Sequence, residues 1–211
     1  MTQGTVGRRE RIGRVLQSFC VPKFDAAEYG PEIAEVLALA GGGLRRMPLA
    51  PRGCPSDKAR DRLDRLDRAR LFAGRKIVST EFAEAARSGL YLYLGRLEDS
   101  HGISQTLPST TGSYWHGIMH RQEPDFGNAA YWFRRVGQHE IFPSLRGVAV
   151  EAAPDRFGGA QKWNPFNFID ACAQVHRRPE ARLESVLEQI QLAEWQLLFD
   201  FSARRAVEAQ P

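Results

Sequence analysis

The sequence predicts an all-α fold: a single-domain, irregular helical bundle of about six to seven helices over residues 1–211. Apolar residues recur at helical spacing along most of the chain, and capping residues, prolines and glycines mark where these segments begin and end. The length of 211 residues fits one domain, since domains contain roughly 50–250 residues. The chain is 43% hydrophobic and 26% charged, which is typical of globular proteins and excludes a disordered one.

Three helices are predicted in the first half of the chain, over residues 24–40, 57–72 and 81–101. The first ends at Gly41, the first of three consecutive glycines. Ser56 is the expected N-cap of the second helix, and Ser79 or Thr80 is the expected cap of the third. The second helix carries two pairs at the i,i+4 spacing that favours ion pairing, Asp61–Arg65 and Asp64–Arg68. Residues 1–11 are expected to be flexible.

Four more helices are predicted in the second half, over residues 113–122, 129–136, from Pro165 onward and over 180–207. Asn128 is the expected cap of the second of these, and Gly137 ends it. Asn164 followed by Pro165 is typical of a helix start, because proline suits the first helical position. Residues 141–162 show no clear helical pattern, and Val148–Val150 is interpreted as a short strand or loop.

Charge, cysteine content and hydropathy exclude several classes of protein. A net charge of +4 permits a nucleic-acid partner but does not favour one, and no nucleic-acid-binding motif is evident. Three widely spaced cysteines predict neither a disulfide framework nor a four-cysteine zinc site, and they fit reduced thiols in a cytoplasm. No apolar run approaches the roughly 18 residues of a membrane span, so no membrane association is expected.

The segment 114–139 holds three of the five histidines and two of the four tryptophans. His116 and His120 are four residues apart and project from one side of a helix, with Glu123 between them in projection. Two imidazoles and a carboxylate suit one divalent metal ion such as zinc, iron or manganese. Pro124 makes the direction of Glu123 uncertain, and the alternative is a pair of hydrogen-bonded histidines in a polar core.

Two further residues are candidate metal ligands. His101 continues the apolar stripe of the helix predicted over residues 81–101, so periodicity places this polar ring against the core, where it needs a partner. Glu194 interrupts the apolar stripe of the last helix, and a carboxylate there also needs a partner. That partner is a metal ion, a histidine, or an arginine such as Arg134 or Arg135.

The remaining polar residues of the dense segment are candidate catalytic groups. His139 or Asp125 is expected to act as a general acid or base. Arg134 or Arg135 is expected to orient an anionic group of a small-molecule ligand by bidentate hydrogen bonds, although stacking on an aromatic ring is the more common role of such an arginine.

The segment resembles the core motif of a family of uncharacterised bacterial and fungal proteins. The residues that carry this resemblance are YWHGIMHR at 114–121, EPDF at 123–126, NA at 128–129 and YWFRRVG at 131–137. Glu140 stands where the motif typically has a proline after its final histidine. The resemblance implies no activity, because none is associated with the family.

Three functional hypotheses follow from these patterns. The first is a metal-dependent enzyme, with hydrolysis favoured over oxidation, in which the ion activates water or polarises a substrate oxygen. The second is a non-catalytic module that binds a small molecule in a pocket rich in histidine and aromatic residues. The third is a protein-interaction domain in which the histidine cluster is structural. The sequence does not determine the oligomeric state.

Overall fold

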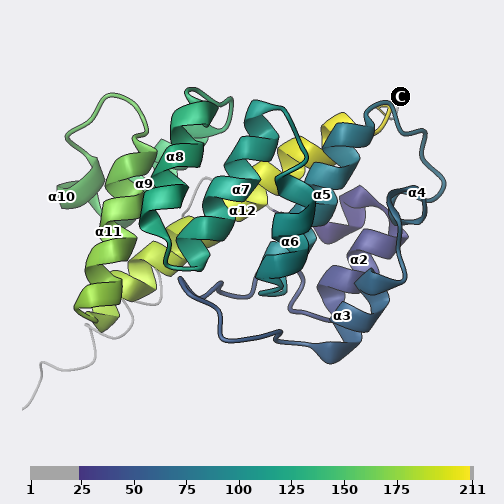
Figure 1. Cartoon of the computed structure of the whole chain (residues 1–211), viewed down its shortest axis with the longest axis horizontal. Helices are drawn as coiled ribbons and strands as arrows, with labels where there is room; N and C mark the ends of the chain where they lie inside the picture. The colour runs from purple at the N-terminus through teal and green to yellow at the C-terminus, as the bar shows by residue number, and fades with distance from the viewer. Residues whose placement is uncertain (1–23, 210–211) are drawn as a thin grey trace, which may run out of the picture.

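The computed structural model describes residues 24–209, and in this part of the chain the regular elements are all helices, with one isolated β-bridge between Ile77 and Val207 (Figure 1). The expected flexible segment 1–11 lies outside the described residues. The elements of the described residues are η1 (Ala26–Tyr29), α2 (Pro31–Ala38), α3 (Asp57–Asp64), α4 (Arg68–Leu71), α5 (Thr80–Tyr93), α6 (Leu97–Ser104), α7 (Thr110–Gln122), α8 (Phe126–Val136), α9 (Phe142–Ala152), α10 (Pro154–Phe157), α11 (Pro165–Arg177) and α12 (Ala181–Ala206).

The all-α class is confirmed, but the expected six to seven helices are too few, since eleven α-helices lie within residues 24–209. Two predicted helices are each divided into two, and residues 141–162 contain α9 and α10 instead of a short strand or loop. None of the helices in the described part of the chain is both long and apolar enough to cross a membrane.

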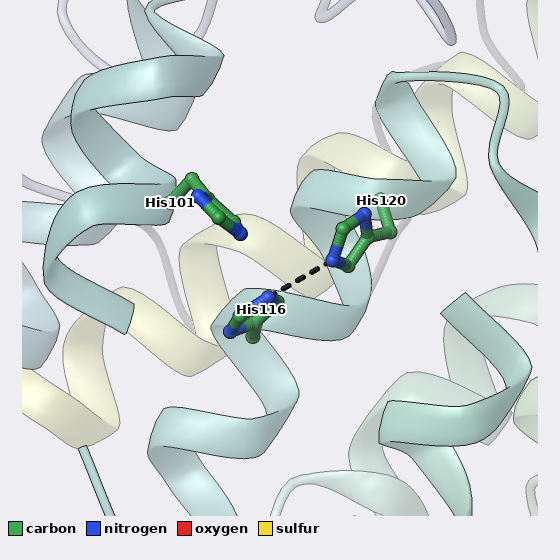
Figure 2. A group of neighbouring side chains, drawn as sticks. All are labelled: His101, His116 and His120. Carbon is green, nitrogen blue, oxygen red and sulfur yellow. Dashed lines mark hydrogen bonds between the residues drawn. The ribbon is translucent and has the colours of Figure 1, made fainter. Parts of the chain in front are cut away.

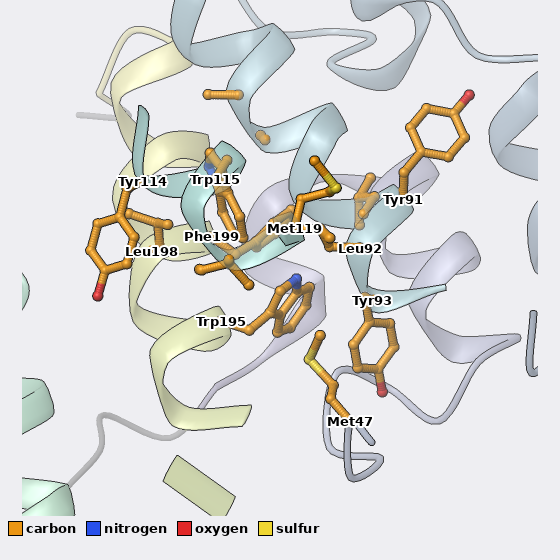
Figure 3. Packing of buried hydrophobic residues seen from close by; sticks show 14 of the residues in the cluster. Met47, Tyr91, Leu92, Tyr93, Tyr114, Trp115, Met119, Trp195, Leu198 and Phe199 are labelled. Atoms are coloured by element: carbon orange, nitrogen blue, oxygen red, sulfur yellow. The ribbon is translucent and has the colours of Figure 1, made fainter. Parts of the chain in front are cut away.

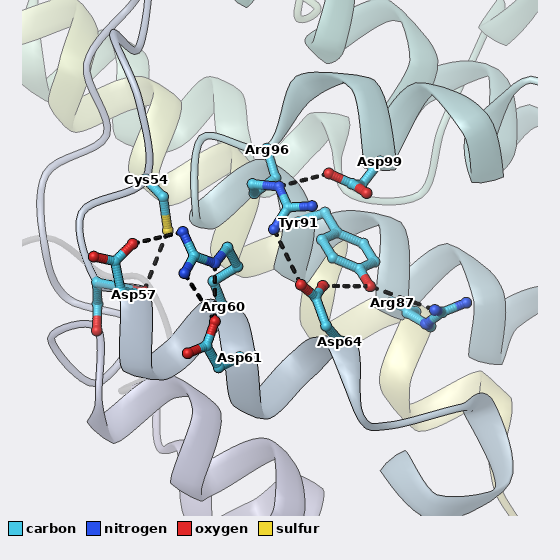
Figure 4. Close-up of polar contacts among 10 residues, drawn as sticks. Cys54, Asp57, Arg60, Asp61, Asp64, Arg87, Tyr91, Arg96 and Asp99 are labelled. Carbon is cyan, nitrogen blue, oxygen red and sulfur yellow. Dashed lines mark hydrogen bonds and ion pairs between the residues drawn. The ribbon is translucent and has the colours of Figure 1, made fainter.

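The helix predicted over residues 57–72 is divided because Asp67 caps a new helix. Its carboxylate accepts a hydrogen bond from the Arg70 backbone amide at 2.8 Å, an arrangement that competes with continuing α3. The expected pairs within one helix are therefore absent from this segment. Asp64 instead pairs with Arg96 at 3.3 Å, and Arg96 also bonds Asp99 (Figure 4). These ion pairs connect α3 to α6.

The helix predicted over residues 81–101 is divided at Gly95. This glycine has a φ of +65°, and a Cβ there would lie 2.8 Å from the Gly53 carbonyl oxygen. The apolar periodicity continues on both sides of the turn, which is why the sequence gives no sign of it. The turn separates α6 from α5, so His101 belongs to a different helix from the one predicted.

The expected boundaries of the later helices are largely confirmed. The side chain of Asn164 accepts a hydrogen bond from the Phe166 amide at 2.9 Å at the start of α11. Gly137 ends α8 with a φ of +61°. The cap of α8 is Asp125 rather than Asn128, because the Asp125 carboxylate accepts from the Asn128 amide at 3.0 Å.

Helix α12 runs behind α7 and α5 along the length of the molecule, and these three helices enclose the core (Figures 1 and 3). Trp195 of α12 donates to the Gly89 carbonyl of α5 at 2.7 Å, and Trp115 of α7 donates to Ser202 of α12 at 3.2 Å. Gly89 permits this packing, because a Cβ there would lie 2.8 Å from the Trp115 ring. Every residue of α7 from Thr111 to Gln122 is buried.

A buried ion pair connects α7 to α12. Arg121 pairs with Glu194 through both terminal nitrogens, and their side chains are 1% and 0% exposed. Tyr114 donates to Glu194 Oε1 at 2.9 Å, and burial together with the Glu194 charge raises the pKa of this phenol well above its ordinary value. Burying charges is costly unless they are paired and hydrogen-bonded, so each partner depends on the other.

We predict that Glu194→Gln lowers the free energy of unfolding by about 3–5 kcal/mol, because it leaves the Arg121 charge buried without a counter-ion. Denaturant unfolding of the two proteins measures the difference. The matched control is Glu140→Gln, which removes an exposed partner of Arg205 and is expected to cost less than about 1 kcal/mol. Equal losses in the two variants would contradict the structural role of the buried pair.

Candidate metal centre

Three of the predicted metal ligands, His101, His116 and His120, form a cluster between two helices. One ring nitrogen of each lies within 4.8 Å of the others. His116 and His120 lie one turn apart on α7, and His101 faces them from α6 (Figure 2). Ser109 caps the start of α7 by accepting from the Gly112 amide at 3.0 Å. The division of the predicted helix into α5 and α6 thus places His101 of α6 opposite His116 and His120 of α7, which lie further along the sequence.

The spacing of the His116 and His120 nitrogens suits ligands of one ion. The Nε2 atoms of His116 and His120 are 2.9 Å apart. Metal–nitrogen bonds of about 2.0–2.1 Å place two nitrogen ligands roughly 2.9–3.4 Å apart at octahedral or tetrahedral angles. The same distance also permits a direct hydrogen bond between the two rings. The cluster can therefore exist with or without an ion.

Glu123 contacts the outer nitrogen of His120. Its Oε2 lies 3.1 Å from His120 Nδ1, and its side chain is 47% exposed. A carboxylate only accepts hydrogen bonds, so Nδ1 of His120 carries the proton and Nε2 keeps its lone pair. Glu123 therefore orients His120 in the way that carboxylates orient metal-binding imidazoles. This contact differs from the direct metal ligation expected of Glu123 from the sequence.

The histidines of α7 favour the neutral form that a metal ion needs. Burial, with repulsion from His120 and His101, lowers the pKa of His116 to about 4. Burial also lowers the pKa of His120, although Glu123 opposes this effect. His116 Nδ1 makes no hydrogen bond of good geometry, although the nearby Ser104 backbone opposes the lowering of the His116 pKa, and the ring stacks on Trp132 at 3.9 Å between centroids. Neutral imidazoles at physiological pH are competent ligands without prior deprotonation.

The structure corrects the prediction that Glu194 is a metal ligand. Its carboxylate is occupied by Arg121 and Tyr114, and it does not belong to the histidine cluster. The apolar stripe correctly indicated a buried, partnered carboxylate, but the partner is neither a metal ion nor Arg134 or Arg135. Sequence reasoning missed Arg121, although Tyr114 and Arg121 are seven residues apart and so lie on one face of α7.

The four predicted catalytic residues do not gather around the histidines. Asp125 caps α8, and Arg134 and Arg135 are exposed. The Arg135 guanidinium lies over the Trp132 ring, 5.2 Å from its centroid, which links it to His116 through this aromatic ring. Trp132 and Asn128, whose Nδ2 lies 3.0 Å from His120 Nε2, contact the cluster in roles that the sequence did not indicate.

His139 occupies a separate buried position. Its Nδ1 accepts from the Ile141 amide at 3.4 Å, so the ring proton is on Nε2, which lies 3.0 Å from the Thr111 hydroxyl. The ring packs against Phe201 at 4.7 Å between centroids. Burial, with a smaller effect of Arg205, lowers the pKa of His139 to about 4. These contacts identify a neutral core histidine and give no support to its expected catalytic role.

Comparisons with known protein families, with curated proteins and with solved structures find no match to this chain. The resemblance to the uncharacterised bacterial and fungal family therefore stays a prediction. The geometry and chemistry of the histidine cluster are the features of the chain that bear on its function.

We predict that His139 titrates near pH 4 in the folded protein and near 6.5 in the unfolded one. Because the folded pKa is lowered, the associated stability is present above about pH 6.5 and is lost as the pH falls toward 4. Imidazole NMR measures the pKa directly, and unfolding of His139→Gln at several pH values is expected to show a weaker pH dependence than the parent. A His139 pKa near 6.5 in the folded protein would disprove this assignment.

Proposed function

We propose that this protein is a metal-dependent enzyme in which His101, His116 and His120 bind one divalent transition-metal ion. The observation that carries the proposal is the convergence of three imidazole nitrogens, within 4.8 Å of one another, from α6 and α7. The α7 imidazoles are buried and have lowered pKa values. Buried polar groups need partners, and one ion between the rings gives a nitrogen of each ring a partner.

The donor set favours zinc-type hydrolytic chemistry. Three imidazole ligands leave a coordination position for water, which is typical of catalytic zinc sites and differs from closed structural sites. Imidazole also binds iron, whereas manganese prefers sites richer in carboxylate. A bound ion of this kind lowers the pKa of its water and polarises a substrate oxygen. His101 is partly exposed, so the cluster reaches the surface from the α6 side.

Arg135 is the predicted catalytic-site residue with the best structural support. It stacks on Trp132, which in turn stacks on His116, and its guanidinium is exposed to solvent. A cation in this position suits a substrate with an anionic group close to the reacting bond. In this proposal, His139 has a structural role and Asp125 caps a helix.

One observation favours a metal-free alternative, in which the histidines pair with one another inside a non-catalytic binding module. The 2.9 Å distance between His116 Nε2 and His120 Nε2 is that of a hydrogen bond. In the described part of the chain, however, the alternative gives the His101 ring no hydrogen bond. The two proposals differ in whether the protein has affinity for a metal ion.

We predict that protein stripped of metal by a chelator binds one Zn²⁺ per chain in a calorimetric titration. His101→Ala is expected to weaken binding by more than the roughly 100-fold that loss of an outer-shell partner causes, because it removes a direct ligand. The matched control is His176→Ala, which changes an exposed histidine outside the cluster and is expected to bind as the parent does. Absence of stoichiometric binding, or equal affinities in both variants, would overturn the proposal.

We predict that Glu123→Ala weakens Zn²⁺ binding by roughly 10–100-fold while the stoichiometry stays at one, because Glu123 orients His120 without being a ligand. The same titration measures both quantities. Glu151→Ala, which removes an exposed acid outside the cluster, is the control and is expected to have no effect. Complete loss of binding in Glu123→Ala would instead indicate direct ligation.

A further inference from the structure

An apolar pocket of about 660 Å³ lies between the α2–α3 loop, the α7–α8 turn and helices α11 and α12. In Figure 1, the α2–α3 loop runs along the lower edge of the molecule toward these two helices. Nine of the thirteen residues that line the pocket are apolar, and four of these are prolines. None of the lining residues belongs to the histidine cluster, so the pocket is a separate feature of the surface.

The lining of this pocket favours an apolar occupant. Leu49 and Phe126 are only partly buried there, and contiguous exposed apolar surface is typical of interaction sites. Arg52 and Glu184 carry opposite charges, and the buried Arg121 is already paired, so the lining selects neither an anion nor a cation. The volume is many times the roughly 30 Å³ of one water molecule, so the occupant contributes several apolar side chains.

The described part of the chain begins on the face of α12 that leads to this pocket. The ring of Phe24 packs on Trp195 of α12 at 5.4 Å between centroids. Gln191 lies one turn before Trp195 on the same face and donates to the carbonyl of Pro48 at 2.9 Å, and Pro48 lines the pocket. Glu184, another lining residue, lies two turns further toward the start of α12 on this face. The pocket therefore extends from about 6 to about 17 Å from Trp195 along the helix axis, at 1.5 Å per residue.

The sequence before Phe24 has the apolar pattern of an amphipathic helix. Four of its apolar residues are spaced i, i+3, i+4 and i+7, and these are Ile12, Val15, Leu16 and Phe19. At 100° per residue, Arg14, Gln17 and Ser18 fall on the opposite side. Phe19 precedes Phe24 by five residues, and an extended chain of that length spans up to roughly 17 Å. The chain is thus long enough to bring this apolar pattern to the pocket.

We propose that residues 12–19 of this same chain dock in the pocket and pack their apolar side chains against its apolar wall. The position of Phe24 favours this segment over a separate molecule, because a tethered segment has a high effective concentration at a nearby site. Docking removes apolar surface of both the segment and the pocket from water, which stabilises the docked arrangement. The docking requires neither a metal ion nor enzymatic activity, so it stands or falls separately from the proposed function.

Trypsin cleavage after Arg14 in the full chain tests the docking, because a protease cuts only the undocked segment. The reference is a synthetic peptide of residues 8–23, which has no pocket to dock in. We expect the full chain to be cut after Arg14 roughly tenfold or more slowly than the peptide, at a rate that does not depend on protein concentration. Cleavage as fast as in the peptide would overturn the proposal. Protection that disappears on dilution would assign the pocket to the segment of a second copy and would also overturn it.

Two substitutions change the two sides of the proposed contact. Leu16→Asp places a charge within the apolar pattern, and Ala50→Trp places a bulky ring at an exposed lining position. Both are expected to raise the rate of cleavage after Arg14 nearly to that of the peptide, because each prevents apolar packing in the pocket. The matched controls are Val6→Asp, which lies before the apolar pattern, and Ala73→Trp, which is exposed outside the pocket, and both are expected to be cut as slowly as the parent. Protection that persists in either Leu16→Asp or Ala50→Trp would contradict the proposal.

Discussion

The burial of α7 from Thr111 to Gln122 determines how the neighbouring helices must pack against it. Every residue in this range is buried, including two histidines, an arginine and a glutamine. A helix that is buried on all sides usually consists of apolar residues. Because α7 does not, each of its polar side chains must obtain its hydrogen bonds and counter-charges from neighbouring helices, since none is available from water.

The neighbouring helices meet this requirement in two different ways. On one side, α12 contributes Glu194, and the resulting ion pair with Arg121 needs no further partner for its charges. On the other side, α6 contributes only another imidazole, His101, so the polar groups there remain incompletely paired. The need to pair buried polar groups therefore produces a stabilising ion pair between α7 and α12, and a candidate metal centre between α7 and α6. Neutral imidazoles and a protonated Tyr114 are both consequences of this burial.

Sequence reasoning predicted what depends on local patterns and missed what depends on long-range contacts. The all-α class, the limits of α12 and the start of α11 follow from periodicity and capping residues, and all are confirmed. The turn at Gly95 was missed because it depends on the approach of Gly53, which belongs to a distant loop. The three histidines were identified as a set, whereas the partner of Glu194 was assigned to the wrong arginine because its position depends on how α7 packs on α12.

The central claim is that His101, His116 and His120 act together as ligands of one ion. X-ray absorption spectroscopy at the zinc edge, on protein loaded with one equivalent of Zn²⁺, tests this most directly. We expect three imidazole nitrogens at about 2.0–2.1 Å and one oxygen ligand from water, with the imidazole number reduced in His101→Ala. A spectrum dominated by oxygen ligands, or by sulfur, or one that is unchanged in His101→Ala, would contradict it.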